Sequence, residues 1–288
     1  MNGPPEAAAS AIPIHHWDPL EVPDFLGVPP DARHDVIDPR GALLPLHALV
    51  LRRPPSTTLV VHLHGALDRQ KYRLPRFERL ATFRDLPHHQ LFLSDPTLQL
   101  DPLLRLGWYV GAQEENSTDR LAVLVREVAR QLEVERIILE GASGGGFGAL
   151  AMAPRLPGSL ALAFSPQANL GRFSNGAPAN SLVRTAFPGY RDHEQLEAAE
   201  PARVDLTALY DRLPGGRGWY IQNSGDEPHV QLQMNPFRER VDDRVTFVEE
   251  HHCMGHNPPT PHRVRAWVEF ACEHYHDDPR PFRLADPG

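Results

Sequence analysis

Residues 136–150 read R-I-I-L-E-G-A-S-G-G-G-F-G-A-L, and this stretch carries the strongest structural signal in the chain. Its β-branched and apolar run at 137–139 is typical of a strand buried on both faces. Residues 141–145 follow the pattern G-x-S-x-G, and the apolar run at 147–152 predicts a helix that packs back on the sheet. A serine between a strand and a helix sits in a strained turn, which requires small residues two positions away on either side. We therefore interpret Ser143 as a catalytic serine at the carboxyl edge of the sheet, the alternative being a purely structural glycine-rich turn.

Apolar runs of strand and helix type alternate through the rest of the chain. We expect strands at 57–63, 91–93, 160–164, 219–222 and 245–248, and helices at 119–132 and 264–275. Residues 42–53 alternate loosely between apolar and polar, which favours an antiparallel hairpin at one edge. Strands that alternate with helices predict an α/β fold, here a three-layer α/β/α sandwich with a mostly parallel sheet.

The elbow sequence and its place in this alternation resemble the α/β-hydrolase superfamily, and the resemblance extends from Leu43 to Tyr275. Members of that superfamily carry a nucleophile elbow after the fifth strand, then an acid and then a histidine along the chain. Three further segments are similar to α/β-hydrolase-like proteins found with polysaccharide-modifying enzymes: L-S-D-P-T-L at 93–98, G-W-Y-V-G at 107–111 and S-P-Q-A-N at 165–169. The resemblance implies an α/β-hydrolase fold with a serine, an acid and a histidine in its active site.

Two segments depart from the alternation. Residues 1–33 are rich in proline, alanine and acidic side chains, and we expect an irregular N-terminal arm there, before a single domain at 34–288. Residues 168–218 interrupt the alternation with glycine, proline, asparagine and short helical pieces, at the position where the superfamily places a lid. Because long insertions in compact domains are more often functional or disordered than inert, we expect a lid-like insert, the alternative being a surface loop without a gating role.

The candidate base lies in C-M-G-H-N-P-P, residues 253–259, which follow the expected strand at 245–248. A serine hydroxyl is a poor nucleophile at neutral pH, so a base must accept its proton as attack proceeds. A loop after the last strand places an imidazole at the carboxyl edge of the sheet, and the neighbouring glycine leaves the ring of His256 free to swing inward. His251 and His252 are the competitors, but they lie on or next to the end of the strand.

The candidate acid lies in Q-N-S-G-D-E-P-H, residues 222–229. An imidazole base needs a carboxylate that fixes its tautomer and stabilises the imidazolium ion. Asp226 follows the expected strand at 219–222 and precedes His256 in the chain, which matches the position of the acid in the superfamily. The neighbouring Glu227 is the alternative acid. The other alternative is that Asp226 is a solvated turn carboxylate with no catalytic role.

Two backbone N–H groups are needed to stabilise the oxyanion of an acyl-transfer intermediate. We assign the first to Gly144, directly after the serine. The second is expected after the strand at 57–63, where H-G-A ends at Ala66 and resembles the His-Gly element of esterases and lipases. The longer His-Gly-Gly-Gly form is absent from this chain. His62 and His64 are alternatively interpreted as core histidines.

Two other motifs compete with a serine mechanism. H-H-C-M-G-H at 251–256 contains imidazole and thiolate groups, which suit zinc. Strand alternation sends His251 and His252 to opposite faces, so we expect no metal site there. The glycine-rich residues 141–148 resemble a phosphate loop, but no Lys-Ser or Lys-Thr follows them, so we expect no nucleotide to bind.

Composition limits the class of protein. At 288 residues, with 41% hydrophobic and 23% charged residues, the chain can bury one full core. A formal net charge of −8 without a basic run argues against a nucleic-acid partner. Neither a leader-like N-terminus nor a run of about 18 apolar residues is present, so we expect no secretory signal and no membrane span. Cys253 and Cys272 are too few for a disulfide framework, which favours a cytoplasmic protein.

These residues together predict acyl transfer through an acyl-enzyme on Ser143, with Asp226 and His256 completing a triad. The expected activity is cleavage of a carboxylic ester, in a small molecule or a glycan, with water as the acceptor and no cofactor. An O-acyltransferase or a polysaccharide (acetyl) esterase is the alternative enzyme. A catalytically silent α/β-hydrolase that serves as a binding module is the alternative from another class.

Aromatic side chains bear on the glycan alternative, because sugar rings stack on exposed aromatic faces. Five aromatic residues are candidates for such faces: Trp108, Tyr109, Phe173, Trp219 and Tyr220. A place in the core is the alternative for each of them. The sequence leaves the substrate and the oligomeric state open.

Overall fold

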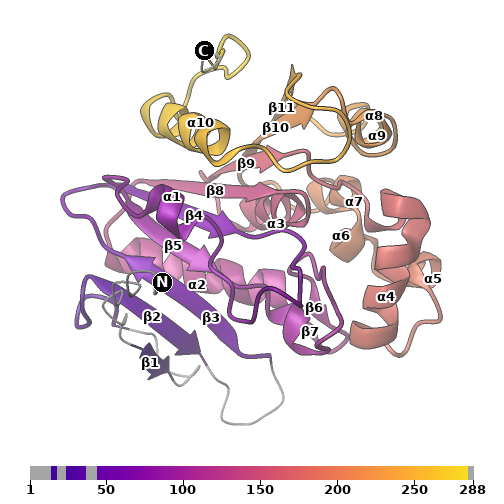
Figure 1. Ribbon diagram of the computed structural model, residues 1–288, viewed down its shortest axis with the longest axis horizontal. Helices are drawn as coiled ribbons and strands as arrows, with labels where there is room; N and C mark the ends of the chain where they lie inside the picture. The colour runs from indigo at the N-terminus through magenta and orange to yellow at the C-terminus, as the bar shows by residue number, and fades with distance from the viewer. Residues whose placement is uncertain (1–13, 18–23, 37–43, 285–288) are drawn as a thin grey trace, which may run out of the picture.

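A nine-stranded sheet forms the centre of the described part of the molecule (Figure 1). The structure is a computed structural model that describes residues 14–17, 24–36 and 44–284. The strand order is β1 (Ile14–Trp17), β2 (Asp31–Val36), β3 (Leu46–Leu51), β5 (His89–Leu93), β4 (Thr58–Leu63), β8 (Arg136–Ala142), β9 (Leu160–Phe164), β10 (Arg217–Asn223) and β11 (Val245–Glu250). From β5 to β11 the neighbouring strands are parallel, whereas β3 is antiparallel to both β2 and β5. The antiparallel pairing expected at 42–53 is therefore made by β3, but β3 is the third strand from the end of the sheet and not its edge.

Helices cover both faces of the sheet, and a separate apolar cluster lies under each set (Figure 1). One face carries α2 (Ser117–Gln131) and α3 (Gly144–Met152), and the other carries α1 (Leu80–Phe83) and α10 (Pro261–Glu273). Ile138 belongs to the cluster of Trp267, whereas Leu139 belongs to the cluster of Leu150, because successive side chains of a strand point to opposite faces. The fold is a three-layer α/β/α sandwich with a mostly parallel sheet, as the sequence predicts.

Short helical segments complete the described fold. They are the 3₁₀ turns η1 (Pro96–Gln99) and η2 (Ala153–Arg155), the short helices α8 (Glu227–His229) and α9 (Asn235–Arg238), and a π-helical turn, η4 (Val230–Met234), between these two helices. No helix within residues 14–17, 24–36 and 44–284 is long and apolar enough to span a bilayer.

The insert between β9 and β10 is mostly helical. It contains η3 (Leu170–Gly176), α4 (Ala177–Ala186), α5 (His193–Ala199), α6 (Pro201–Val204) and α7 (Leu206–Tyr210). Leu182 and Phe187 are buried in the cluster that also holds α2 and α3. The insert is thus packed into the main core, and it ends at β10, which begins at Arg217.

A small hairpin of β6 (Gly111–Ala112) and β7 (Glu115–Asn116) lies beside the insert (Figure 1). Arg203 joins the two, because its guanidinium donates hydrogen bonds to the carbonyl oxygens of Ala112 and Glu115 at 2.7 and 2.8 Å. These side-chain contacts hold the insert against the hairpin.

The N-terminal residues differ in part from the irregular arm expected at 1–33. Ile14–Trp17 forms β1, which pairs in parallel with β2 at the edge of the sheet. Residues 1–13 and 18–23 lie outside the described residues. A four-residue edge strand is too short for its apolar periodicity to be read from the sequence, which explains why this strand was not expected.

Four of the five aromatic residues considered as sugar-stacking faces are buried. Trp108, Tyr109, Trp219 and Tyr220 are 0%, 0%, 2% and 0% exposed. Trp219, for example, packs edge-to-face on Trp267 with 6.3 Å between the ring centroids. For these four residues the core alternative holds and a sugar-stacking face is excluded, because their rings are buried. Phe173 is partly exposed.

Candidate active site

Ser143 lies at the turn between β8 and α3. Its backbone adopts φ 53° and ψ −119°, a strained conformation that is rare for a residue with a side chain. A Cβ atom at Gly141 would lie 2.3 Å from backbone atoms of Gly145, and one at Gly145 would lie 2.4 Å from the carbonyl oxygen of Leu63. The small residues on either side of Ser143 are therefore required by close contacts between backbone atoms.

Ser143, His256 and Asp226 are joined by hydrogen bonds, with the imidazole of His256 between the other two. Nε2 of His256 is 2.9 Å from Oγ of Ser143, and Nδ1 of His256 is 2.6 Å from Oδ2 of Asp226. Asp226 is 1% exposed, whereas His256 is open to solvent. Burial by itself raises the pKa of the Asp226 carboxyl, but the N–H donors of His229 and His256 outweigh burial and lower this pKa below its ordinary value. The structure brings together the three residues that the sequence singled out and keeps the carboxylate ionised.

Asn223, the last residue of β10, joins the loop after β10 to the loop after β11. Its Nδ2 atom donates hydrogen bonds to the carbonyl oxygens of Cys253 and Gly255, at 2.9 and 3.2 Å, and its Oδ1 atom accepts one from the N–H of Gly225 at 3.2 Å. A Cβ atom at Gly225 would lie 2.0 Å from the carbonyl oxygen of Cys253, so only glycine fits there. These two loops carry the candidate acid and base, and Asn223 fixes one relative to the other.

The two segments that carry the expected oxyanion donors border the serine, since Ala66 lines the same cavity as Ser143. Gly144 is the first residue of α3, where a backbone N–H has no partner within the helix. A Cβ atom at Gly65 would lie 3.8 Å from Cβ of Ser143 and 3.9 Å from the backbone nitrogen of Gly144. The N–H of Gly65 donates to the Glu78 carboxylate at 3.3 Å, which leaves Ala66 as the next N–H of this loop.

Two cavities meet at Ala66. The first has a volume of about 190 Å³ and is lined by Ser143, His256, Glu78 and Arg79, among others. The second has a volume of about 300 Å³ and is mainly apolar. Its walls come from the loop before β6 and from the insert: Leu103, Leu104, Leu106, Phe173 and Pro178. The candidate nucleophile thus faces a small cavity whose lining includes two charged residues, and the insert borders the apolar cavity beside it.

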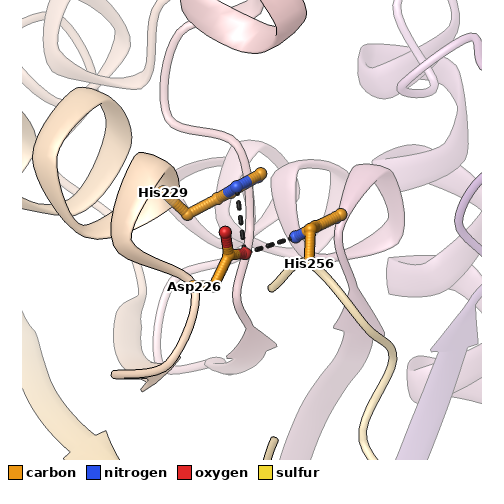
Figure 2. Close-up of side chains that lie close together, drawn as sticks. All are labelled: Asp226, His229 and His256. Carbon is orange, nitrogen blue, oxygen red and sulfur yellow. Dashed lines mark hydrogen bonds and ion pairs between the residues drawn. The ribbon is translucent and has the colours of Figure 1, made fainter. Parts of the chain in front are cut away.

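Two residues that sequence reasoning missed complete the polar contacts around Ser143. Nε2 of Gln167, just beyond β9, donates a hydrogen bond to Oγ of Ser143 at 3.0 Å. His229 is buried in α8, and its Nδ1 atom lies 3.0 Å from Oδ2 of Asp226 (Figure 2). The available signals were S-P-Q-A-N at 165–169, at the carboxyl end of a strand beside the elbow, and a histidine three residues after the candidate acid.

The histidines and the cysteine at 251–253 do not gather with His256 into a metal-binding group. Among the described residues, three possible metal ligands do lie together, since donor atoms of Asp226, His229 and His256 fall within 4.8 Å of one another (Figure 2). Both Nδ1 atoms contact the same carboxylate oxygen at hydrogen-bonding distance, 2.6 and 3.0 Å. A metal ion would have to displace both contacts, so we interpret the group as a hydrogen-bonded cluster.

His62 and His64 are core residues, each 3% exposed. Nδ1 of His62 lies 3.0 Å from Oε2 of Glu140, and Nε2 of His64 accepts a hydrogen bond from the backbone N–H of Asp95 at 3.0 Å. Burial lowers the pKa of His62, and the Glu140 carboxylate opposes this in part. The core alternative is the one that the structure supports for both histidines.

No protein-family model and no curated protein sequence matches the chain. Several solved structures do resemble it. The capsule O-acetyltransferase of Neisseria meningitidis serogroup A has 13% sequence identity and a TM-score of 0.61, over 79% of this chain and 91% of that chain. An S-formylglutathione hydrolase from Agrobacterium tumefaciens has 15% identity and a TM-score of 0.56, over 84% and 94%. An acetyl xylan esterase from Paenibacillus sp. R4 has 18% identity and a TM-score of 0.54, over 80% and 79%.

At these identities the likeness concerns the fold alone. The mostly parallel sheet and the helices on both faces agree with it. The chain therefore has the α/β-hydrolase fold.

Proposed function

We propose that the protein is a serine hydrolase that cleaves a carboxylic ester through an acyl-enzyme on Ser143. The observation that carries this proposal is the unbroken series of hydrogen bonds from Oγ of Ser143 through His256 to the buried carboxylate of Asp226, at 2.9 and 2.6 Å. Ser143, at the start of this series, lines a cavity of about 190 Å³, where an ester carbonyl can reach the serine.

The geometry supports a two-step reaction. Nε2 of His256 accepts the Ser143 proton while Oγ forms a bond to the ester carbonyl carbon. The same imidazole then gives that proton to the departing alcohol as the carbon–oxygen bond of the ester breaks. Water attacks the acyl-enzyme in the second step, gives a proton to His256, and the acid leaves as Ser143 recovers its proton. Asp226 holds the Nδ1 proton of His256 and stabilises the imidazolium ion.

The backbone N–H groups of Gly144 and Ala66 are the donors that we assign to the oxyanion. A donor of this kind contributes about 3–4 kcal/mol to the stabilisation of the transition state, judged by the removal of a single one. Both donors are backbone groups, so the residues that carry them need not be glycines. This is consistent with the absence of a longer glycine motif after His64.

An O-acyltransferase is the second candidate, because Glu78 and Arg79 offer charged groups inside the serine cavity, where an acceptor hydroxyl can be oriented. A solved structure with a similar fold is a capsule O-acetyltransferase, and another is an acetyl xylan esterase. A glycan hydroxyl would then replace water in the second step. The silent binding module has less support, since a binding protein does not need a strained serine bonded to a histidine–carboxylate pair.

The proposal is tested with the Ser143→Ala variant and p-nitrophenyl acetate. Alanine fits the same turn, so the fold should persist while kcat falls by roughly 10⁴ to 10⁶. Adding a sugar acceptor and measuring free acetate against acetylated sugar separates hydrolysis from transfer. A variant that keeps a tenth of the wild-type rate would exclude Ser143 as the nucleophile.

A further inference from the structure

Asp226 serves two histidines. Its Oδ2 atom lies 2.6 Å from Nδ1 of His256 and 3.0 Å from Nδ1 of His229 (Figure 2). The two imidazole rings are stacked, with 3.9 Å between their centroids and an angle of 4° between their planes. The carboxylate is therefore shared between an exposed ring that faces Ser143 and a second ring that is 4% exposed.

The direction of each hydrogen bond follows from Trp108. Its indole Nε1 is a donor only, and it lies 2.9 Å from Oε1 of Gln167. The amide nitrogen of Gln167 must then face the opposite side, where it is 3.0 Å from Oγ of Ser143 and 3.0 Å from Nε2 of His229. Because an amide nitrogen donates, Nε2 of His229 accepts, and the proton of this ring is on Nδ1, from which it is donated to Asp226.

These contacts close a ring of hydrogen bonds. Ser143 donates to His256, His256 and His229 both donate to Asp226, and Gln167 donates to His229 and to Ser143. We propose that Gln167 and His229 belong to the active site: Gln167 is a catalytic residue that donates a hydrogen bond to Oγ of Ser143, and His229 is a positioning residue for Gln167 and Asp226. This inference rests on the function proposed above.

The contribution of Gln167 follows from the charge on Oγ. Negative charge develops on this atom when it gives its proton to His256, and again when the bond between Oγ and the acyl carbon breaks in the second step. A donor at 3.0 Å stabilises that charge in both steps. Trp108 and His229 hold the amide of Gln167 in the required orientation. Nε1 of Trp108 donates to the amide oxygen, and Nε2 of His229 accepts from the amide nitrogen.

His229 suits a positioning role because its ring stays neutral. Burial lowers its pKa, and the Asp226 carboxylate opposes this in part. The groups that face the ring are Asp226, His256 and Gln167, together with the ring of Phe173, whose centroid lies 5.5 Å from that of His229. A neutral ring keeps Nε2 as an acceptor for Gln167, and this nitrogen faces Gln167 rather than Ser143, so His229 is not the base.

The hydrogen bond that His229 donates to Asp226 also acts on the candidate base, His256. Each donor draws charge from the carboxylate and reduces its attraction for the protonated form of His256. The titratable groups beside His256 are Asp226 and the stacked ring of His229, and the charged residues Glu78 and Arg79 line the same cavity as His256. Loss of the N–H donor of His229 alone should therefore move the acid limb of the rate profile to higher pH, by roughly 0.5 to 1 unit.

Three substitutions at one position separate the two roles of His229. His229→Phe keeps an aromatic ring but removes both polar contacts. His229→Asn places an amide N–H near the position of Nδ1, and His229→Gln places an amide oxygen near the position of Nε2. The readouts are kcat/KM for p-nitrophenyl acetate from pH 5 to 9 and the labelling of Ser143 by a fluorophosphonate, with unfolding temperature as the check on folding.

We expect His229→Phe to lower kcat/KM by roughly 10- to 100-fold and to move the acid limb to higher pH. His229→Asn should keep the limb in its wild-type position with a lowered rate. His229→Gln should recover most of the rate with a displaced limb.

Gln167→Met should lower the rate without moving the limb, and it carries the test if His229→Phe does not fold. His252→Ala is the matched control and should behave as wild type.

Labelling distinguishes the two proposals. If the wild-type protein is not labelled at Ser143, the proposed function fails. If it is labelled and the folded His229 and Gln167 variants keep the wild-type rate and limb, or if the Asn and Gln variants cannot be told apart, the ring of hydrogen bonds has no catalytic role and the inference is overturned.

Discussion

The elbow and the insert border the same serine, but they are held in different ways. At the elbow, backbone touches backbone, and a Cβ atom at Gly145 would lie 2.4 Å from the carbonyl oxygen of Leu63. The insert is held largely by side chains. Arg203 binds the β6–β7 hairpin, and the ring of Phe173 lies 6.4 Å from that of Trp108 and 5.8 Å from that of His256.

This difference separates chemistry from selectivity. Close backbone contacts leave no room for substitution, so the position of the nucleophile is fixed whatever ester is bound. Side chains of the insert can be exchanged without moving that backbone, and they line the apolar cavity beside the serine. Changes on the elbow side should therefore affect every substrate alike, and changes in the insert should alter which ester is preferred.

Substitution of the buried acid is the strongest test on the elbow side. Asp226→Asn should lower kcat by roughly 10⁴ for short and long esters alike, because an amide favours the wrong imidazole tautomer. Glu227→Gln, at the exposed neighbouring residue, is the control and should have little effect. Steady-state hydrolysis of p-nitrophenyl esters measures both. If the two effects are exchanged, the acid has been assigned one residue too early.

Truncation of Phe173 tests the insert. Phe173→Ala enlarges the apolar cavity, so the ratio of kcat/KM for long and short p-nitrophenyl esters should change by roughly 10-fold or more. Labelling by a small fluorophosphonate should stay within a few-fold of wild type, because the triad and the oxyanion donors lie outside the insert. An unchanged ester preference would mean that the insert does not shape the substrate site.

The smallest effect is expected for the histidines beside the base. Activity should fall as the pH falls, because only a neutral imidazole accepts the serine proton. The pKa of Asp226 lies below its ordinary value, so this carboxylate stays ionised and the acid limb belongs to the imidazole. His251→Ala and His252→Ala should leave the limb in place, and EDTA or phenanthroline should leave the rate unchanged. A chelator-sensitive rate that added zinc restores would contradict a metal-free mechanism.

Local sequence patterns were sufficient for the sheet and the elbow. The run at 137–139 and the glycines around Ser143 specify a buried strand and a strained turn, because each depends on residues next to one another in the chain. Asp226 and His256 could be chosen because the ends of parallel strands meet at one edge of the sheet. Their roles remain a proposal.

Contacts between distant segments could not be predicted in the same way. The bond from Gln167 to Ser143 depends on the amide orientation that Trp108 imposes from 59 residues away. The burial of Trp108 and Trp219 depends on the packing of whole layers, so their aromatic character alone could not decide between a sugar-stacking face and a place in the core. Three helices of the insert, α5, α6 and α7, are only 7, 4 and 5 residues long, too short for a clear periodicity, and the insert is stabilised by the core and by Arg203.

Labelling of the wild-type protein with a fluorophosphonate, followed by peptide mapping, is the most direct measurement of the proposed chemistry. The reagent mimics an ester at the moment of attack and reacts only with a serine whose proton a base can accept. We expect one adduct, on Ser143, and a strong reduction of it in His256→Ala. An adduct on another serine, or a folded protein that remains unlabelled, would contradict a triad of Ser143, Asp226 and His256.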